Sequence, residues 1–192
     1  MSGVTRKSAA EIALMRRAGA VVADVLALVE ELAVPGASSA EIALAAERKI
    51  LAAGASSNFK GYHGFPSVIC LSIDREVVHG IPGDREIKAG ALVSVDAGAI
   101  IEGWHGDAAR SFYVGGEAPA EVARLIRVTR EALDAGIAAA RPGRTIEEIS
   151  AAIEDVGLAA GVGIVRPYVG HGIGRAMHEA PQSRTTALGG RA

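Results

Sequence analysis

Cysteine is almost absent from this sequence. Its 192 residues include one cysteine, Cys70, so no disulfide can form within the chain. This excludes the disulfide-stabilised scaffolds typical of small secreted proteins and fits a reducing compartment. We therefore expect a cytoplasmic protein.

An excess of charge of either sign is lacking, and so is a long apolar run. Lysine and arginine number 20 against 22 aspartates and glutamates, for a formal net charge of −2. No basic stretch is long enough to form a nucleic-acid face. The apolar segment at 18–34 is interrupted by Asp24, Glu30 and Glu31, which favours a packed amphipathic helix over a membrane span. We expect neither direct nucleic-acid binding nor membrane association, so partners have to be inferred from a site.

A repeat is what the sequence does contain. Hydrophobic residues make up 49% of the chain, enough for the core of one domain. Residues 35–54 and 142–161 both begin with Pro-Gly and end with Leu-Ala-Ala-Gly, without a gap between the two patterns. In each copy a hydroxyl residue, Ser38 or Thr145, precedes a glutamate by three positions, which predicts a capping box at the start of a helix. The final glycine of each copy is typical of a helix end.

A longer helix is predicted before each Pro-Gly turn. The first begins near Ser8, which has Glu11 three positions later, and the second begins near Pro119, since proline is favoured at the first helical position. Unrelated helical hairpins could share such signals, but the ungapped match favours two related halves. We predict one α+β domain whose halves, about 8–115 and 116–192, each contain two helices and a sheet.

The sheet of the first half is predicted from three short runs rich in β-branched or aromatic residues, at 68–73, 92–96 and 111–114. The second half is expected to be incomplete, because positions equivalent to Asp96 and Asp107 would be 203 and 214, past the last residue given. Residues 183–192 show little strand pattern. Without a closing hairpin, the helices around Leu133 and Ile153 are expected to expose apolar surface.

Two carboxylates are predicted to share one face of a hairpin. Glu102-Gly103 is a plausible two-residue turn, and in that register Gly98 faces Asp107. Side chains alternate along a strand, so Asp96 points to the same side as Gly98. Asp96 and Asp107 then become diagonal neighbours, with Cα atoms about 7–8 Å apart, and Gly98 leaves space beside them.

Such a carboxylate pair has two interpretations. Neighbouring buried carboxylates repel each other, and their pKa values rise unless a cation lies between them; hard divalent metals supply that cation. The alternative is an exposed hairpin with two solvated aspartates, and one extra turn residue would move Asp107 to the other face. The apolar run that ends at Asp96 argues against full exposure, and both interpretations stay open at this stage.

Histidines could complete a metal site. His79 follows two valines that we interpret as the end of an apolar strand, and His171 and His178 lie in a glycine-rich segment that lets a ligand approach closely. Imidazole with carboxylate suits Zn, Mn, Fe or Co, and a pair of such ions can hold a bridging hydroxide and polarise a carbonyl. His63 and His105 are assigned structural roles, with a minor site role left open for His105.

Successive motifs in this sequence resemble those of type I methionine aminopeptidases. They are GYHGFP at 61–66, VVHGIP at 77–82, VD at 95–96 with HGD at 105–107, and GHGIG at 170–174 with HEAPQ at 178–182. They occur in the family's order over residues 12–182. The family has the pita-bread fold, with two pseudo-symmetric αβ halves around a dinuclear metal site, which agrees with the repeat. The resemblance implies a metal-dependent aminopeptidase that removes the initiator methionine from nascent proteins by means of a metal-bridging hydroxide.

The resemblance also implies roles for individual residues. Asp96 would chelate one metal, Asp107 would bridge both, and His171 would bind one, the metals being two divalent ions of Co, Mn, Fe or Zn. His178 would hydrogen-bond the substrate carbonyl, and His79 would contact the scissile amide nitrogen.

Five further side chains fall where the family builds its methionine pocket. Soft, apolar and aromatic walls suit a thioether, although each of these residues could also be ordinary core. They are Phe59, Tyr62, Phe65, Cys70 and Met177.

The sequence departs from the family in one respect. The family uses two further glutamate ligands, one of them a proton-handling base, in the segment that this sequence lacks. We therefore expect these 192 residues alone to bind metal weakly, or to bind only one ion, and to have impaired activity. The partners implied are the N-terminal peptides of nascent proteins near the ribosome, and a monomer is implied.

Two other functions are compatible with the same fold. A non-catalytic pita-bread binding module is one, but it would have no need for the matched acidic and imidazole residues. A proline-directed peptidase of the same superfamily is the other. The pocket segment at 59–70 and the motif at 170–182 favour the methionine enzyme.

Overall fold

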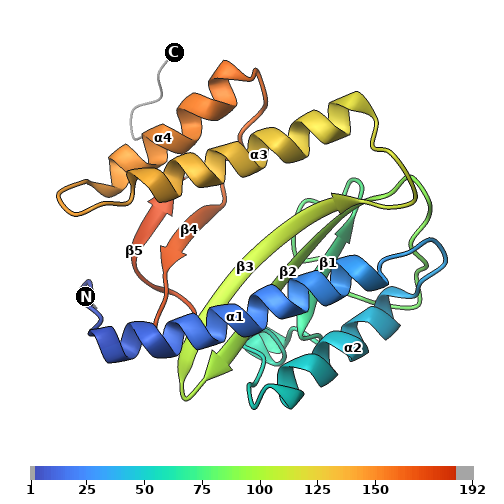
Figure 1. Ribbon diagram of the computed structural model, residues 1–192, viewed down its shortest axis with the longest axis horizontal. Helices are drawn as coiled ribbons and strands as arrows, with labels where there is room; N and C mark the ends of the chain where they lie inside the picture. Colours follow the sequence, from blue (N-terminus) through green and yellow to red (C-terminus); the bar gives the residue numbers. More distant parts are fainter. Residues whose placement is uncertain (1–2, 185–192) are drawn as a thin grey trace. The chain divides into compact units, whose positions relative to one another are not determined.

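The protein is described by a computed structural model over residues 3–184. Two compact units make up the chain: a first unit of Arg6–Ala118 with Ile173–Met177, and a second unit formed by the described parts of Met1–Thr5, Pro119–Gly172 and His178–Ala192. The elements, drawn in Figure 1, are α1 (Ala9–Leu32), α2 (Ser39–Ala52), the short 3-10 helix η1 (Tyr62–Gly64), β1 (Ile69–Ile73), β2 (Leu92–Ile101), β3 (Trp104–Tyr113), α3 (Ala120–Ala139), α4 (Ile146–Ala159), β4 (Val169–Gly172) and β5 (Glu179–Arg184).

Helix α1 begins with the capping box that the sequence predicts. The Glu11 backbone N–H donates to Ser8 Oγ at 3.3 Å, and the Ser8 backbone N–H donates to Glu11 Oε2 at 2.7 Å. These contacts satisfy donors that a helix start leaves unpaired, and the hydrogen bonds from Ser8 lower the pKa of Glu11. The helix turns its apolar residues to one side, where Val22, Val25 and Val29 are buried.

Helix α2 begins differently from the prediction. Ser38 stands at the N-cap position but makes no side-chain cap hydrogen bond, so the expected capping box is wrong here. The Ser38 backbone instead forms a β-bridge with Glu86, and the neighbouring Ser39 hydroxyl donates to Gly83 O at 2.8 Å. A long-range pairing therefore anchors this helix start where the local motif suggested a side-chain cap.

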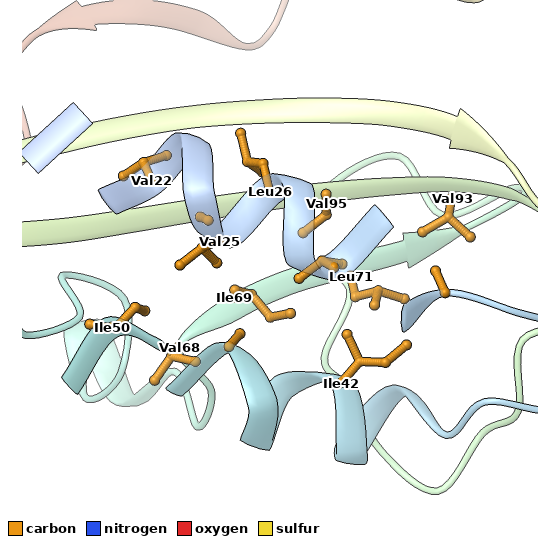
Figure 2. Packing of buried hydrophobic residues seen from close by; sticks show 14 of the residues in the cluster. Val22, Val25, Leu26, Ile42, Ile50, Val68, Ile69, Leu71, Val93 and Val95 are labelled. Atoms are coloured by element: carbon orange, nitrogen blue, oxygen red, sulfur yellow. The ribbon is translucent and has the colours of Figure 1, made fainter. Parts of the chain in front are cut away.

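The first unit contains an antiparallel sheet in the order β1-β2-β3. One face of this sheet packs against α1 and α2. Ile69 and Leu71 of β1 lie opposite Ala97 and Val95 of β2 on that face, and all four are at most 1% exposed. Figure 2 shows the strand side chains meeting those of the two helices in a closely packed aliphatic core. Truncating a side chain buried like Leu71 to alanine would cost about 2–5 kcal/mol.

Gly106 of β3 fixes how closely α1 approaches the sheet. A Cβ placed at this residue would lie 2.8 Å from the backbone of Ala18 and Gly19. Residue 106 therefore faces the helix. Since side chains alternate along a strand, His105 and Asp107 point to the opposite face. The fold thus separates a helix-covered core face from a second face that carries polar side chains.

The second unit repeats the helical pattern of the first. Helices α2 and α4 have equivalent bounds displaced by the same number of residues (39 to 146, and 52 to 159). Their ends are equivalent too: Gly54 and Gly161 have φ of 68° and 63°, and Ala55 N and Val162 N donate back to Ile50 O and Gly157 O. This is the glycine C-terminal motif predicted from the sequence.

Two helix starts in this unit also follow the sequence. The Thr145 capping box is present, with Glu148 N donating to Thr145 Oγ1 at 3.2 Å, and α3 starts at Ala120 directly after Pro119. Strands β4 and β5 then pair antiparallel. Because β5 runs to Arg184, the expectation that strand pattern ends before Ser183 is wrong for Ser183 and Arg184, and residues 185–192 lie outside the described chain.

Two further expectations meet a mixed outcome. Leu133 is 52% exposed, as anticipated, but Ile153 is half-buried, because its Cδ1 packs against Gly136 of α3. Residues 77 and 78 form no strand and are exposed, so the strand expected before His79 is wrong. No helix within residues 3–184 combines the length and the apolar character needed to cross a bilayer.

Candidate metal and substrate site

The β2–β3 hairpin has the register predicted from its turn. Ile101 pairs with Trp104 and Gly98 with Asp107. The turn residues Glu102 and Gly103 have φ of 50° and 78°, which is the two-residue geometry with positive φ at both positions that matches strand twist. Asp96, which pairs with Ala109, is therefore a diagonal neighbour of Asp107 on the face away from the helices.

Asp96 and Asp107 influence each other strongly. Burial is the main cause that raises the pKa of Asp96 to about 7, and the charge of Asp107 raises it further. Burial also raises the pKa of Asp107 to about 6, against the effect of its hydrogen bond with Asp96. Without a cation the two carboxyl groups therefore compete for protons near neutral pH. A divalent cation between them would remove both the repulsion and the cost of burial, so this donor set fits a hard or borderline metal.

Cys70 lies on the same face as the aspartates. It pairs directly with Asp96 across β1 and β2 and is 6% exposed. Burial, followed by the charges of Asp96 and Asp107, raises the pKa of the Cys70 thiol to about 12. A thiol in this state is protonated at neutral pH and behaves as a small apolar wall.

Asn58 is a site residue that sequence reasoning missed. A Cβ at Gly98 would overlap the Asn58 carboxamide, so the space that the sequence suggested beside the aspartates is filled by Asn58. Its Nδ2 donates to Gly106 O at 3.4 Å and lies 3.4 Å from Nδ1 of His105. Asn58 thus ties the loop before β1 to the β3 strand that carries Asp107. No local pattern around position 58 indicates this contact, which depends on Gly98 forty residues later.

His79 approaches the aspartates from the loop after β1. Its charge lowers the pKa of Asp96, so the imidazole lies within electrostatic range of that carboxyl. Its backbone has φ of 58°, an uncommon conformation for a residue with a side chain. The next residue holds it there: Leu71 N donates to Gly80 O at 2.9 Å and Gly80 N to Ser72 Oγ at 3.1 Å. A Cβ at Gly80 would lie 2.8 Å from Ser72 Cα, so only glycine allows this close approach.

Four of the five predicted pocket residues form one cluster. Phe59, Cys70 and Met177 are buried together, and Phe65 packs against them half-buried. Tyr62 is 44% exposed and is not a member of this cluster; its ring meets His63 edge-on. The cluster is built from aromatic and sulfur-containing side chains and is separate from the aliphatic core of the first unit.

His171 and His178 lie together in the second unit. Their ring centroids are 4.2 Å apart, and His171 Nδ1 lies 3.0 Å from Gly172 O. Because a carbonyl oxygen only accepts, Nδ1 of His171 is the donor in this hydrogen bond, and Nε2 is the ring nitrogen left for another partner. A hydrogen bond from one ring nitrogen to a carbonyl is the usual way in which a metal-binding imidazole is oriented.

The described residues form no cluster of three or more metal-binding side chains. Across residues 3–184, histidine, cysteine, aspartate and glutamate do not come together in such a group. Within the first unit, Asp96 and Asp107 form a pair, Cys70 lies opposite Asp96, and the charge of His79 acts on Asp96. Within the second unit, the rings of His171 and His178 lie together.

Comparison with known proteins gives a consistent result. The family model of metallopeptidase family M24 matches residues 13–191. The methionine aminopeptidase of Clostridium acetobutylicum is 45% identical over 92% of this chain and 70% of its own length. Methionine aminopeptidase 1 of Mycobacterium tuberculosis is 48% identical over 93% and 69%. The crystal structure of the Rickettsia prowazekii methionine aminopeptidase superposes with a TM-score of 0.94 at 33% identity, covering 98% of this chain and 76% of that one.

Proposed function

Because the chain belongs to metallopeptidase family M24, we propose that it carries out metal-dependent removal of the N-terminal methionine from nascent proteins. The expected similarity to type I methionine aminopeptidases is confirmed, and so is the α+β pita-bread fold class. The observation that carries the proposal is the Asp96–Asp107 pair, which shares one face of a hairpin and has raised pKa values. We place the reaction in the cytoplasm, with a monomer acting on chains that emerge from the ribosome.

The proposed metal ligands are Asp96, Asp107 and His171. Asp107 would be shared by two divalent ions of Co, Mn, Fe or Zn, Asp96 would chelate one of them, and His171 would bind one. When bound, such ions activate water and polarise a carbonyl. The fit is supported by the two half-buried carboxylates with raised pKa values and by the His171–Gly172 hydrogen bond, which uses Nδ1 and leaves Nε2 for a metal.

Two histidines are proposed to handle the substrate without binding metal. His178 would donate a hydrogen bond to the carbonyl oxygen of the scissile bond, and His79 would contact its amide nitrogen. The support for His79 is its electrostatic contact with Asp96 and its clamped backbone beside β1. The hydrogen bonds of Gly80 hold the backbone next to His79, so the exposed imidazole starts from a fixed position beside β1.

The cluster of Phe59, Phe65, Cys70 and Met177 is proposed to receive the methionine side chain, with Tyr62 at its exposed side. Sulfur and aromatic groups interact favourably with a thioether. Because the thiol of Cys70 stays protonated, the pocket wall next to the carboxylates adds no charge to the site.

We propose that these 192 residues, tested alone, bind one ion more readily than two and turn over slowly. The resemblance implies five metal ligands, of which this sequence contains three and lacks the two glutamates. This chain matches about 70% of the length of its curated relatives, which are longer. A chain extended by a hairpin carrying two glutamates at family-like spacing should hydrolyse peptide faster. Equal rates for the two chains would refute this part of the proposal.

A peptide panel tests the function. Tripeptides beginning with Met, Leu or Pro and followed by a small residue are incubated with the extended chain and Mn²⁺ or Co²⁺. We expect hydrolysis of the Met peptide alone, abolished by Asp107→Asn and unaffected by Asp84→Asn, a change at an exposed carboxylate. Cleavage directed at proline would favour the proline-directed peptidase. No cleavage of any peptide, with metal bound, would favour the binding module.

A further inference from the structure

We propose that Arg175 is a positioning residue that fastens the segment Ile173–Met177 to the β2–β3 hairpin and so holds Met177 in the apolar cluster. We call this set of contacts the clasp: Arg175, Trp104, the Glu102 carbonyl, and the His105–Gly174 backbone hydrogen bond. All of these residues belong to the first unit. The consequence for substrate selection rests on the proposed function, whereas the clasp itself does not.

The side chain of Arg175 makes two contacts with the hairpin tip. Its guanidinium carbon lies 4.6 Å from the centroid of the Trp104 ring, a geometry in which the positive charge is attracted to the aromatic face. Its Nη1 donates to Glu102 O at 3.3 Å. Trp104 is 2% exposed, and its Nε1–H has no acceptor in the described part of the chain. The indole is therefore held by packing and by the guanidinium.

Both this contact and the turn require the absence of a side chain at Gly103. Its φ of 78° suits the tight hairpin, and a Cβ at this position would lie 2.9 Å from Arg175 Nη1. A side chain here would displace the guanidinium. The same glycine therefore makes the turn and leaves room for the arginine that packs on it.

The backbone provides a second point of attachment. His105 N donates to Gly174 O at 2.9 Å, and Gly174 N donates to Ala176 O at 3.1 Å. Ile101 and Trp104 form the hydrogen-bonded pair next to the two-residue turn, so the following pair, Ile100 and His105, is not hydrogen-bonded across the strands. The His105 N–H therefore points away from β2, to the outer edge of the sheet. The segment is thus attached to this edge and then turns tightly toward Met177.

Met177 connects the clasp to the apolar cluster, because it is the last residue of the clasped segment and packs in the cluster. It is 7% exposed and is buried with Phe59 and Cys70, although its neighbours Arg175 and Ala176 are exposed. Because Arg175 and Ala176 are exposed, they bury little surface that could fix the chain before Met177. The attachment of this segment to the hairpin therefore determines where Met177 lies. Loosening of the clasp should therefore open the cluster on the side that Met177 covers.

The position of the Arg175 side chain does not depend on an ion pair with the Glu102 carboxylate. The Glu102 carboxylate is paired with Arg17 at 2.6 Å, whereas Arg175 takes the Glu102 carbonyl and the Trp104 ring. Lysine would keep the charge of Arg175 but lose the planar guanidinium, which can stack on the Trp104 ring and hydrogen-bond the Glu102 carbonyl at the same time. Arg17→Ala is accordingly a matched control, because it removes an arginine of α1 that pairs with the Glu102 carboxylate and takes part in none of the clasp contacts.

The chain carries its own probes for this test. Trp104 is the one tryptophan and Cys70 the one cysteine in the sequence; Trp104 belongs to the clasp, and Cys70 is buried with Met177 in the apolar cluster. Acrylamide quenching of fluorescence reports on Trp104, and the rate of alkylation by iodoacetamide reports on Cys70, both in the full 192-residue chain with circular dichroism as the folding check. We expect Arg175→Ala to increase quenching about twofold and alkylation about tenfold, Arg175→Lys to give intermediate values, and Arg17→Ala to match the wild type.

Three results would overturn the proposal. They are unchanged alkylation of Cys70 despite greater quenching of Trp104, no change in either probe, and an equal change in the Arg17→Ala control. If Arg175→Ala loses its helical signal, Arg175→Lys is judged by the same criteria. In the extended, active chain, Arg175→Ala should raise KM for a Met peptide while leaving Mn²⁺ affinity unchanged. Failure of all peptide hydrolysis would count against the proposed function, and the two probes would still decide the clasp.

Discussion

Cys70 lies directly opposite Asp96 in the antiparallel pairing of β1 with β2, so a thiol and a carboxyl project from the same face of the sheet. Burial is the main cause that raises the pKa of Cys70 to about 12, and the charges of Asp96 and Asp107 add to it. The pocket wall and the carboxylate pair are therefore electrostatically linked, and a change in one should be measurable at the other.

The first prediction uses this link. Asp96→Asn removes one of the negative charges that raise the pKa of Cys70, so the pKa should fall and alkylation at pH 9 should become a few-fold faster, because each pKa unit changes the thiolate fraction about tenfold. The effect should be smaller than that of unfolding, since burial is the larger cause. The pH profile of iodoacetamide labelling measures it, with Asp84→Asn as control. Identical profiles for the wild type and Asp96→Asn would contradict the assignment.

The second prediction concerns metal affinity. In the extended chain, Asp96→Asn and Asp107→Asn should each weaken Mn²⁺ binding by more than about 100-fold, because losing a group that merely orients a ligand already costs about 10–100-fold. Isothermal titration calorimetry measures the affinity. Full-strength binding by the Asp107→Asn variant would remove this residue from the site.

The third prediction is the pH dependence of stability without metal. The carboxyl pKa values of about 7 and about 6 in the folded protein exceed the ordinary value of about 4, so the folded state binds protons more tightly than the unfolded state. The contribution of the pair to the free energy of unfolding is therefore most favourable below about pH 4. It declines as the pH rises towards 7.

Urea unfolding at pH 5 and pH 8 in the presence of a chelator measures this dependence. The double variant Asp96→Asn/Asp107→Asn should lose it, whereas saturating Mn²⁺ should make the wild type more stable at pH 8, because the cation replaces the protons. A wild type that gains stability between pH 5 and pH 8 without metal would contradict the raised pKa values.

The fourth prediction tests the packing of Asn58 on Gly98. Gly98→Ala should destabilise the protein by about 1–3 kcal/mol, because the new methyl group would overlap the Asn58 carboxamide. In an Asn58→Ala background the same substitution should cost clearly less, which a double-mutant cycle by urea unfolding would show. Equal costs in the two backgrounds would mean that the overlap is relieved in another way.

The fifth prediction compares equivalent caps. Thr145→Ala should cost about 1 kcal/mol, the usual value for a lost N-cap, because the Thr145 hydroxyl accepts from Glu148 N. Ser38→Ala should cost less, because Ser38 makes no side-chain cap hydrogen bond. Thermal unfolding of both variants measures the difference, and a larger loss at Ser38 would contradict the structure of α2.

The features predictable from the sequence are those fixed by local geometry. Glu102-Gly103 permits one short hairpin, and the register of that hairpin places Asp96 and Asp107 on one face. The Pro-Gly turns, the helix-ending glycines and the Thr145 cap were predictable for the same reason, since each depends on residues a few positions apart.

The features that were missed depend on contacts distant in sequence. Ser38 has the capping pattern, but its backbone pairs with Glu86. The valines before His79 have a strand-like composition, but they lie in an exposed loop beside β1. Asn58 and Arg175 matter because of Gly98 and Trp104, which are distant along the chain. A pattern within a short window cannot indicate any of these.

The tight turn at Glu102-Gly103 also limits how this hairpin can diverge. Inserting one residue there would reverse the parity of β3, sending the Asp107 carboxyl towards α1 and a neighbouring side chain into its place. Inserting two would keep the parity but lengthen the tip that Arg175 covers. Length variants among descendants of this protein should therefore avoid single-residue insertions at this tip, unless a compensating bulge arises elsewhere in the same strand.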